Sequence, residues 1–230
     1  MSERRPAASP SDGVVLLHGI SRTARSFRRM ELALDDAGFA TLNLDYDSRR
    51  KPLDALAEDI HPALDRFARS LEGAVHFVCH SMGGLLARVY LAQHRPARLG
   101  RVVMLGTPNG GSEIADRLKN LAAYRAFFGP AGQQLVTRRD AATSALLPAI
   151  DYPTGIIAGN RSVYPITSIG LPRPHDGRVS VANTRLDGMA DHIVIRTSHP
   201  WLVRNADAIA QTIAFLQTGQ FARDAVIRQP

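Results

Sequence analysis

Short apolar runs alternate with longer amphipathic stretches along almost the whole chain. The apolar runs predict strands, which cover residues 14–17, 39–44, 75–79, 101–105, 154–158 and 192–196. Apolar residues at helical spacing between these runs predict helices over residues 23–37, 53–71 and 201–217, and a further one that follows Ser81 and ends near Arg95. This alternation predicts an α/β fold, in which a mostly parallel, doubly wound sheet carries helices on both faces.

Two of the predicted helices raise questions of detail. Pro62 stands inside the stretch 53–71, and we expect it to kink that helix or to restart it. In the last helix, five residues share the face expected to point inward: Leu202, Ala206, Ile209, Ile213 and Leu216.

A long stretch between two strands breaks the regular alternation. Nearly fifty residues separate residues 101–105 from residues 154–158, and helical pieces are expected within residues 113–128 and 134–147. An insertion at the carboxyl edge of a parallel sheet lies over the usual ligand crevice. We therefore expect a cap or lid at about residues 109–150; the alternative is a plain structural elaboration.

Length and composition bound the organisation of the chain. Its 230 residues suit one domain, predicted at residues 13–230 after a disordered lead-in at residues 1–12. The lead-in lacks the apolar segment of a signal peptide, and no apolar run approaches the roughly 18 residues that span a bilayer. A single cysteine excludes an internal disulfide. These features together favour a cytoplasmic location.

The formal net charge of +7 comes almost wholly from arginine. The arginines are scattered and form no basic stripe with aromatic partners, so we expect no nucleic-acid partner. The charge allows a weak attraction to an anionic membrane surface or an acidic lipid, but a general preference for arginine over lysine explains it more simply. The oligomeric state is not readable from the sequence.

A serine stands at a sharp boundary between a strand and a helix. The apolar run 75–79 leads through His80 to Ser81, and a helical stretch begins with Met82 and Gly83. A serine hydroxyl is a poor nucleophile unless it is exposed at such a turn and given a base, and the turn tolerates only small neighbours. The usual pattern is G-x-S-x-G, whereas here Cys79 replaces the first glycine. We interpret Cys79 as a small packing residue rather than a second nucleophile.

A serine nucleophile needs a histidine base within hydrogen-bond reach. In doubly wound hydrolases this base follows the last strand, and His199 stands there, on a loop before the last helix. His192 opens that strand and is the main alternative. His94 and His175 are the remaining downstream histidines and are less well placed.

The base in turn needs a carboxylate that orients it. Asp176 fits, because Gly177 lets its loop turn and the alternating apolar residues that follow anchor it. Asp151 precedes its strand and so lies at the wrong end of the sheet. Asp187 and Asp191 lie in a turn-like stretch that favours solvated side chains.

Attack of a serine on a carbonyl carbon turns the carbonyl oxygen into an oxyanion, which needs backbone N–H donors. Met82 opens the helix after the nucleophile, so its N–H and the helix dipole are available there. The second donor is expected to be the N–H of Ile20, since Gly19 lets the loop after the first strand bend close to the substrate. We expect His18 to brace that loop by hydrogen bonding and His80 to serve in packing.

At these motifs the chain resembles the α/β-hydrolases, and among them the bacterial lipase and GPI inositol-deacylase-like branch. The matching segments lie in order over residues 14 to about 201: 17–19, 80–84, 106–112, 176–179 and 198–199. The resemblance implies the α/β-hydrolase fold, with hydrolysis of small-molecule or lipid carboxylic esters through an acyl-enzyme on Ser81. It implies a Ser81–Asp176–His199 triad and no metal or organic cofactor.

Other functions use the same residues. An acyltransferase, a thioesterase or an amidase would need the same triad, because the shape of the pocket decides among these reactions. A hydrolase fold used only for binding would be expected to have lost the nucleophile, the base or the acid, and all three are present here.

Overall fold

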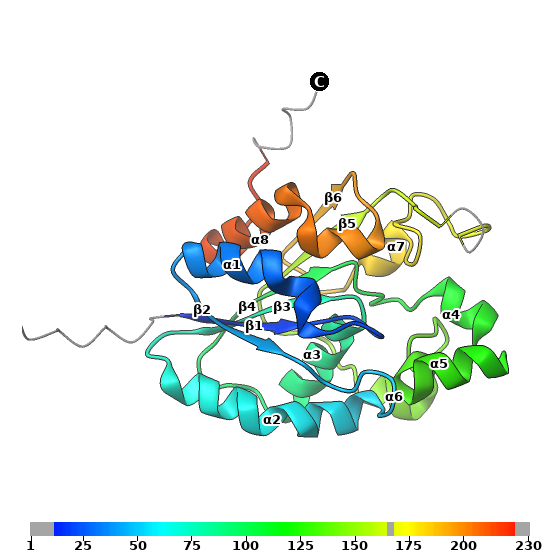
Figure 1. The fold of residues 1–230 in the computed structure, drawn as a ribbon, viewed down its shortest axis with the longest axis horizontal. Helices are drawn as coiled ribbons and strands as arrows, with labels where there is room; N and C mark the ends of the chain where they lie inside the picture. The colour runs from blue at the N-terminus through cyan, green and yellow to red at the C-terminus, as the bar shows by residue number, and fades with distance from the viewer. Residues whose placement is uncertain (1–11, 165–167, 224–230) are drawn as a thin grey trace, which may run out of the picture.

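A six-stranded, wholly parallel sheet forms the centre of the protein, as a computed structural model of residues 12–164 and 168–223 shows (Figure 1). Its strands are β1 (Gly13–Leu17), β2 (Ala40–Leu44), β3 (Val75–His80), β4 (Leu99–Leu105), β5 (Thr154–Gly159) and β6 (Asp191–Ile195), in the order β2-β1-β3-β4-β5-β6. Adjacent strands pair in parallel throughout. The predicted parallel, doubly wound α/β architecture is confirmed.

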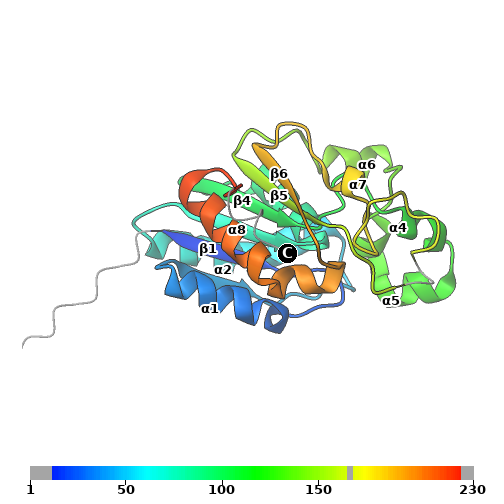
Figure 2. The same cartoon turned by 90° about the horizontal axis from the view of Figure 1, so that it is seen from above.

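Helices cover both faces of the sheet (Figures 1 and 2). The principal helices are α1 (Arg28–Asp36), α2 (Leu53–Ser70), α3 (Met82–Gln93), α4 (Glu113–Leu118), α5 (Ala122–Gln133), α6 (Ala141–Ala145), α7 (Val181–Thr184) and α8 (Ala206–Thr218). Two short 3-10 helices, η1 (Ala24–Phe27) and η2 (His199–Arg204), precede α1 and α8. η1 and α1 together correspond to the helix predicted at residues 23–37, and η2 and α8 to the helix predicted at residues 201–217.

Alternate side chains of each strand enter one of two separate cores. On β1, Val15 and Leu17 pack with α2 and α3, whereas Val14 and Leu16 pack with α1 and α8. Both sets are fully buried because helices cover the sheet on two faces. Such a strand is apolar along its whole length. This explains why the strands read in the sequence as continuous apolar runs.

Of the two outcomes expected for Pro62, a restart of the helix does not occur. Helix α2 is a single element that contains Pro62 at an internal position. A proline there removes one hydrogen bond, to the carbonyl oxygen four residues earlier. Leu56, Ile60 and Leu64 are buried on the core face of the same helix, and their packing against α3 and the sheet offsets the loss.

The last predicted helix differs from expectation at its start. The 3-10 helix η2 ends before Asn205, whose side chain accepts the N–H of Ala208 and begins α8. The helical phase therefore resets, so Ala208 is buried and Ala206, expected to point inward, is exposed.

The stretch between β4 and β5 carries α4, α5 and α6 and lies at the carboxyl end of the sheet (Figure 2). The helical pieces expected within residues 113–128 are α4 and the first part of α5, which continues to Gln133 and contains a non-helical Gly129. Of residues 134–147 only α6 is helical. Arg139 donates to the carbonyl oxygens of Pro108, Asn109 and Gln134, which holds the preceding residues in a loop instead.

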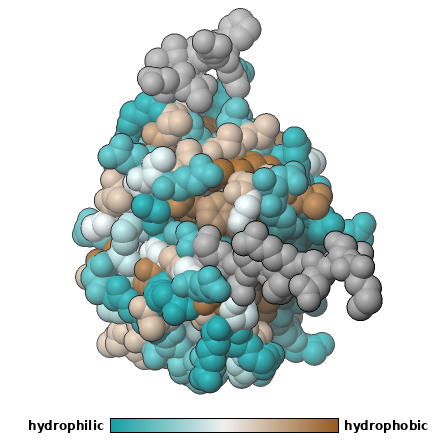
Figure 3. Space-filling view, turned by 90° about the vertical axis from the view of Figure 1, so that its left-hand side faces the viewer, coloured by the Kyte–Doolittle hydropathy of each residue, from teal (hydrophilic) through white to brown (hydrophobic). Residues whose placement is uncertain are grey.

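The face at the opposite end of the molecule from α4–α6 carries hydrophilic side chains, with hydrophobic ones in smaller groups between them (Figure 3). Of the predicted lead-in, residues 1–11 lie outside the described residues. Asp12, its last residue, accepts the N–H of Ala74 through its carboxylate. Within the described residues, no helix is both long and apolar enough to cross a membrane.

Helix α3 starts against the end of β1 because Gly83 has no side chain. A Cβ atom built at Gly83 would stand 2.2 Å from the carbonyl oxygen of Leu17 and 2.7 Å from that of His18. Both contacts are with backbone, which cannot rotate away. Gly83 thus sets how closely the turn at Ser81 approaches the loop after β1.

We expect Gly83→Ala to lower the free energy of unfolding by about 1–3 kcal/mol, because the added methyl group forces α3 away from β1. Urea unfolding followed by circular dichroism measures the change. The exposed Ala92, near the other end of α3, provides the control: Ala92→Ser should change the same free energy by less than about 0.5 kcal/mol. Equal effects of the two substitutions would contradict this account of Gly83.

Candidate active site

Ser81 lies at the turn between β3 and α3 in a backbone conformation that few residues adopt. Its φ is 54° and its ψ is −126°, and Ser21 is the one other non-glycine residue with a positive φ in the described part of the chain. Such strain persists only where the surroundings hold it. Here the N–H of Ser81 donates to the carbonyl oxygen of Leu105 on β4, at 2.9 Å. The turn therefore presents the hydroxyl beyond the carboxyl end of the sheet.

Ser81, His199 and Asp176 form one chain of hydrogen bonds. The Nε2 atom of His199 lies 2.9 Å from the Oγ of Ser81, and its Nδ1 lies 2.6 Å from Oδ2 of Asp176. Because an ionised carboxylate only accepts, Nδ1 carries the proton and Nε2 is free to accept the serine hydroxyl proton. The arrangement can thus transfer a proton from the hydroxyl to the imidazole as the oxygen attacks a carbonyl carbon.

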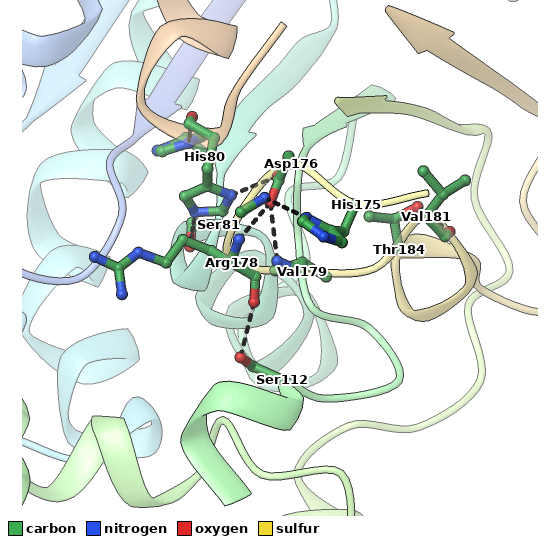
Figure 4. A network of polar contacts seen from close by, with 11 residues as sticks. His80, Ser81, Ser112, His175, Asp176, Arg178, Val179, Val181 and Thr184 are labelled. Carbon is green, nitrogen blue, oxygen red and sulfur yellow. Dashed lines mark hydrogen bonds and ion pairs between the residues drawn. The ribbon is translucent and has the colours of Figure 1, made fainter. Parts of the chain in front are cut away.

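The carboxylate of Asp176 is fully buried and fully engaged (Figure 4). Its second oxygen, Oδ1, accepts the backbone N–H groups of Arg178 and Val179, at 2.9 and 2.8 Å. Its own carbonyl oxygen accepts the N–H of His199, at 3.0 Å. These bonds keep the carboxylate aimed at the imidazole and tie the loop after β5 to the loop after β6.

Gly106, at the end of β4, leaves room for this pair. Its φ is +58°, and an added Cβ atom would stand 3.0 Å from Oδ2 of Asp176 and 3.2 Å from Nδ1 of His199. A larger residue would strain the backbone and press on the hydrogen bond between the two side chains.

His80 holds the backbone of His199 in place. Its Nε2–H donates to the carbonyl oxygen of His199 at 3.0 Å, and the two rings lie 4.8 Å apart. Burial lowers the pKa of His80 well below 6.5, and the neighbouring His199 lowers it further. His80 is therefore neutral at pH 7 and acts as a donor to backbone, in keeping with the packing role expected for it.

Hydrogen bonds and a stack of two rings hold the loop after β1 in place. His18 donates from Nδ1 to the carbonyl oxygen of Gly19, at 2.8 Å, and the hydroxyl of Tyr46 donates to the carbonyl oxygen of His18. The His18 ring also stacks on Tyr46, with ring centres 4.0 Å apart. Burial lowers the pKa of His18, so this contact is made by a neutral ring. The loop is thereby held against the sheet.

Two backbone N–H groups are available beside Ser81. Among the described residues, no acceptor takes the N–H of Ile20 or that of Met82, the first residue of α3. Ile20 and Ser81 both line the same cavity. Two unpaired donors beside a nucleophile are what an oxyanion requires, and the amino end of α3 adds its dipole.

Cys79 lies in the core, away from this chemistry. It is wholly buried in β3, between Leu17 of β1 and Met104 of β4. Burial raises the pKa of its thiol far above neutrality, so it stays protonated and unreactive. Its position supports the interpretation of Cys79 as a packing residue.

A cavity of about 300 Å³ opens above Ser81 and His199. Its apolar wall comes from the stretch between β4 and β5: Ile114, Ala115, Leu118, Tyr124, Phe127, Phe128 and Leu135. Gly19, Ile20, Ser21 and Arg22 from the loop after β1 also line the cavity, as do Arg178 and Tyr164. The helices α4 and α5 thus shape the space in which a substrate would lie.

The other candidate histidines are occupied elsewhere. His192 lies on the edge strand β6 and contacts the hydroxyl of Thr184, and burial lowers its pKa to about 4. The ring of His94 lies 2.7 Å from Glu58, and that of His175 accepts the N–H of Gly177. The structure brings none of these rings to Ser81.

The other candidate carboxylates also lie outside the site. Asp151 pairs with Arg95, and Asp191 accepts the N–H groups of His192 and Phe221. Asp187 is exposed in its turn. Within the described residues, no group of three or more His, Cys, Asp or Glu side chains is arranged to hold a metal ion.

Three site residues were missed by sequence reasoning. Tyr46 donates a hydrogen bond to the loop after β1, and Arg178 and Tyr164 line the cavity. Arg178 stands two residues after Asp176, inside a segment already singled out, and its charge was the available signal. The contacts of Tyr46 and Tyr164 depend on tertiary packing and leave no local pattern.

Comparison with protein-family models gives one match. The model described as "Alpha/beta hydrolase family" matches residues 14–222, which include Ser81, Asp176 and His199.

Solved structures with similar folds include lipolytic enzymes. The mature form of the Bacillus licheniformis lipase BlEst2 matches with a TM-score of 0.75 and 18% identity, over 95% of each chain. The Legionella pneumophila phospholipase PlaB matches with a TM-score of 0.66 and 15% identity, over 91% of this chain and 62% of that one. The type II thioesterase BorB from the borrelidin biosynthetic cluster matches with a TM-score of 0.56 and 17% identity, over 93% and 94%. At these identities the matches concern the fold.

The hydrogen-bonded geometry predicts that Ser81 reacts with a fluorophosphonate probe, its Oγ bonding to phosphorus as fluoride leaves. Asp176→Asn should slow this labelling by about 10³–10⁴-fold, because an amide stabilises the wrong imidazole tautomer. Labelling is followed by intact-protein mass spectrometry, with Ser81→Ala as the blank. Asp187→Asn, which changes an exposed carboxylate, should label at the native rate. Equal labelling of the Ser81→Ala protein would refute the assignment.

Cys79→Ala should leave the labelling rate of Ser81 within about threefold of the native rate, since the thiol takes no part in proton transfer. The same substitution should lower the free energy of unfolding by about 1 kcal/mol, because it leaves a small gap in the core that β3 shares with α2 and α3. Urea unfolding and probe labelling of one protein preparation measure both. Loss of labelling in the folded variant would mean that Cys79 belongs to the reactive site.

Proposed function

The chain belongs to the alpha/beta hydrolase family, and from this premise we propose that it is a serine hydrolase that cleaves carboxylic esters through an acyl-enzyme on Ser81. The observation that carries the proposal is the hydrogen-bonded chain from Ser81 through His199 to Asp176, at the base of a cavity with an apolar wall. The fold likeness to lipases supports it.

Acylation begins when the Oγ of Ser81 attacks the ester carbonyl carbon. The hydroxyl proton passes to Nε2 of His199 over the 2.9 Å contact, and Asp176 stabilises the imidazolium that results. The carbonyl electrons move onto oxygen and form a tetrahedral oxyanion. When this intermediate collapses, the bond to the alcohol oxygen breaks and His199 returns its proton to the departing alcohol.

Deacylation repeats the same steps with water. His199 takes a proton from a water molecule as its oxygen attacks the acyl carbon, and a second oxyanion forms. Collapse of this intermediate breaks the bond to Oγ of Ser81, which recovers its proton from His199. The carboxylic acid leaves, and no cofactor enters the cycle.

The N–H groups of Ile20 and Met82 stabilise both oxyanions. Each donor of this kind contributes about 3–4 kcal/mol to the stability of the transition state. The bonds from His18 and Tyr46 hold the loop so that the N–H of Ile20 is in place before the substrate arrives, which avoids a reorganisation cost during the reaction.

The apolar wall of the cavity suits the acyl part of the substrate. Ile114, Leu118, Tyr124 and Phe128 present hydrocarbon surface beside Ser81, and an aliphatic or aromatic acyl group gains by leaving water there. A small-molecule or lipid ester is therefore the expected substrate.

Hydrolysis of thioesters is the second candidate. The likeness to the thioesterase BorB favours it, and the same nucleophile, base and oxyanion donors would act on a thioester carbonyl. The difference would lie in the leaving group, which the shape of the cavity admits or excludes.

The proposal predicts turnover of 4-nitrophenyl esters of butanoic, hexanoic and decanoic acids, followed by the absorbance of 4-nitrophenol. Ser81→Ala should reduce kcat/KM by about 10⁴-fold or more, as loss of the nucleophile does in related sites. The S-butanoyl thioester of N-acetylcysteamine, assayed in parallel with a thiol reagent, tests the second candidate. If neither ester nor thioester turns over faster than with folded Ser81→Ala protein, the proposed function is wrong.

A further inference from the structure

Arg178 places a half-buried positive charge in the cavity above Ser81. Its backbone is held by the bond from its N–H to Asp176 and by the hydroxyl of Ser112, which donates to its carbonyl oxygen at 3.0 Å. Its side chain runs away from Asp176 (Figure 4). The guanidinium carbon lies 4.2 Å from the ring centre of Tyr164, so the group is stacked and oriented.

No carboxylate of the described residues pairs with this guanidinium. Three acids lie on the elements around it, and none forms an ion pair with it: each accepts hydrogen bonds from other groups, although Oε2 of Glu113 is buried without a partner among the described residues. Asp176 binds His199 and two backbone N–H groups. On α4, Glu113 accepts from Ser180 and Asn183, and Asp116 accepts from the N–H and hydroxyl of Thr137.

A second cation, Arg22, lines the same cavity from the loop after β1. It is exposed and has no carboxylate partner among the described residues. Both positive charges therefore line the same cavity as Ser81.

An oriented, half-buried guanidinium is costly to leave without an anion, because it has lost part of its hydration and gained no ion pair. We propose that the substrate is an ester that carries a carboxylate, and that Arg178 binds this carboxylate while the ester carbonyl lies at Ser81. This rests on the proposed function and names its substrate class. The planar fork of a guanidinium matches the two oxygens of a carboxylate, and one such charge balances one cation.

The carboxylate sits on either the acyl part or the alcohol part of the ester, and two matched substrate pairs separate these cases. For the acyl part, the half-ester 4-nitrophenyl glutarate is compared with 4-nitrophenyl 4-carbamoylbutanoate. For the alcohol part, 4-(butanoyloxy)phenylacetate is compared with 4-(butanoyloxy)phenylacetamide. Within each pair an uncharged amide of similar size replaces the carboxylate. The rate without enzyme is subtracted, because the glutarate carboxylate also attacks its own ester, and the ratio of kcat/KM for the charged to the neutral ester then measures recognition of the carboxylate.

The wild-type ratio should exceed one in one of the two pairs, and Arg178→Gln should lower that ratio by about tenfold or more, as expected for a lost charge-assisted contact. Arg178→Lys, which keeps the charge but loses the fork, should lower it by an intermediate factor. The kcat/KM of the neutral ester is measured in each variant as the reference of the ratio, and circular dichroism checks that both variants are folded.

Arg29 provides the matched control, since it is exposed on α1 and does not line the cavity. Arg29→Gln removes the same net charge and should leave the ratio unchanged. Three results overturn the proposal while turnover of the neutral esters upholds the proposed function. They are a wild-type ratio that does not exceed one in either pair, a ratio that Arg178→Gln does not lower, and a ratio that Arg29→Gln lowers equally. If none of the four esters is turned over while 4-nitrophenyl butanoate is, this inference alone is overturned. If no ester or thioester of the earlier assay is turned over either, the proposed function is wrong as well.

Discussion

The hydrogen bond between the buried carboxylate of Asp176 and His199 is the interaction on which the site depends. A carboxylate without exposure is stable only when its oxygens are paired, and here two backbone N–H groups and one imidazole N–H pair them. The bond joins the loops after β5 and β6, and it reaches Ser81 only because all six strands end at the same edge of a parallel sheet. Gly106 leaves the space in which it forms.

The proposed catalytic residues and the cavity beside them come from different parts of the architecture. The strands and their following loops carry Ser81, Asp176 and His199, whereas α4 and α5 supply the apolar wall. The two parts are joined by polar bonds to backbone, such as those of Arg139 to the carbonyl oxygens of Pro108 and Asn109 and that of Ser112 to Arg178. Changes in the wall can therefore alter which substrates enter while the reactive chain of hydrogen bonds stays in place.

Where sequence reasoning succeeded, the physical signal was local. Fully buried parallel strands leave continuous apolar runs, and a tight turn of the Ser81 type needs small residues such as Gly83 beside it. Where it failed, the deciding contact was distant. The segment after α5 forms a loop because Arg139 binds the carbonyl oxygens of Pro108 and Asn109, which lie 31 and 30 residues earlier in the chain. The effect of Asn205 was local, but its capping role was not anticipated.

The sequence by itself determined the α/β fold, the serine at a strand-to-helix turn and the order of residue types around it. These properties follow from periodicity and from the small set of residues that a tight turn accepts. Only the tertiary structure decided which histidine and which carboxylate form the chain of hydrogen bonds with Ser81. His192 and Asp191 come from the neighbouring strand β6, but they contact Thr184 and the N–H of Phe221 instead. The tertiary structure alone showed that Arg178 has no carboxylate partner among the described residues, because pairing of charges is a property of three-dimensional distance and burial.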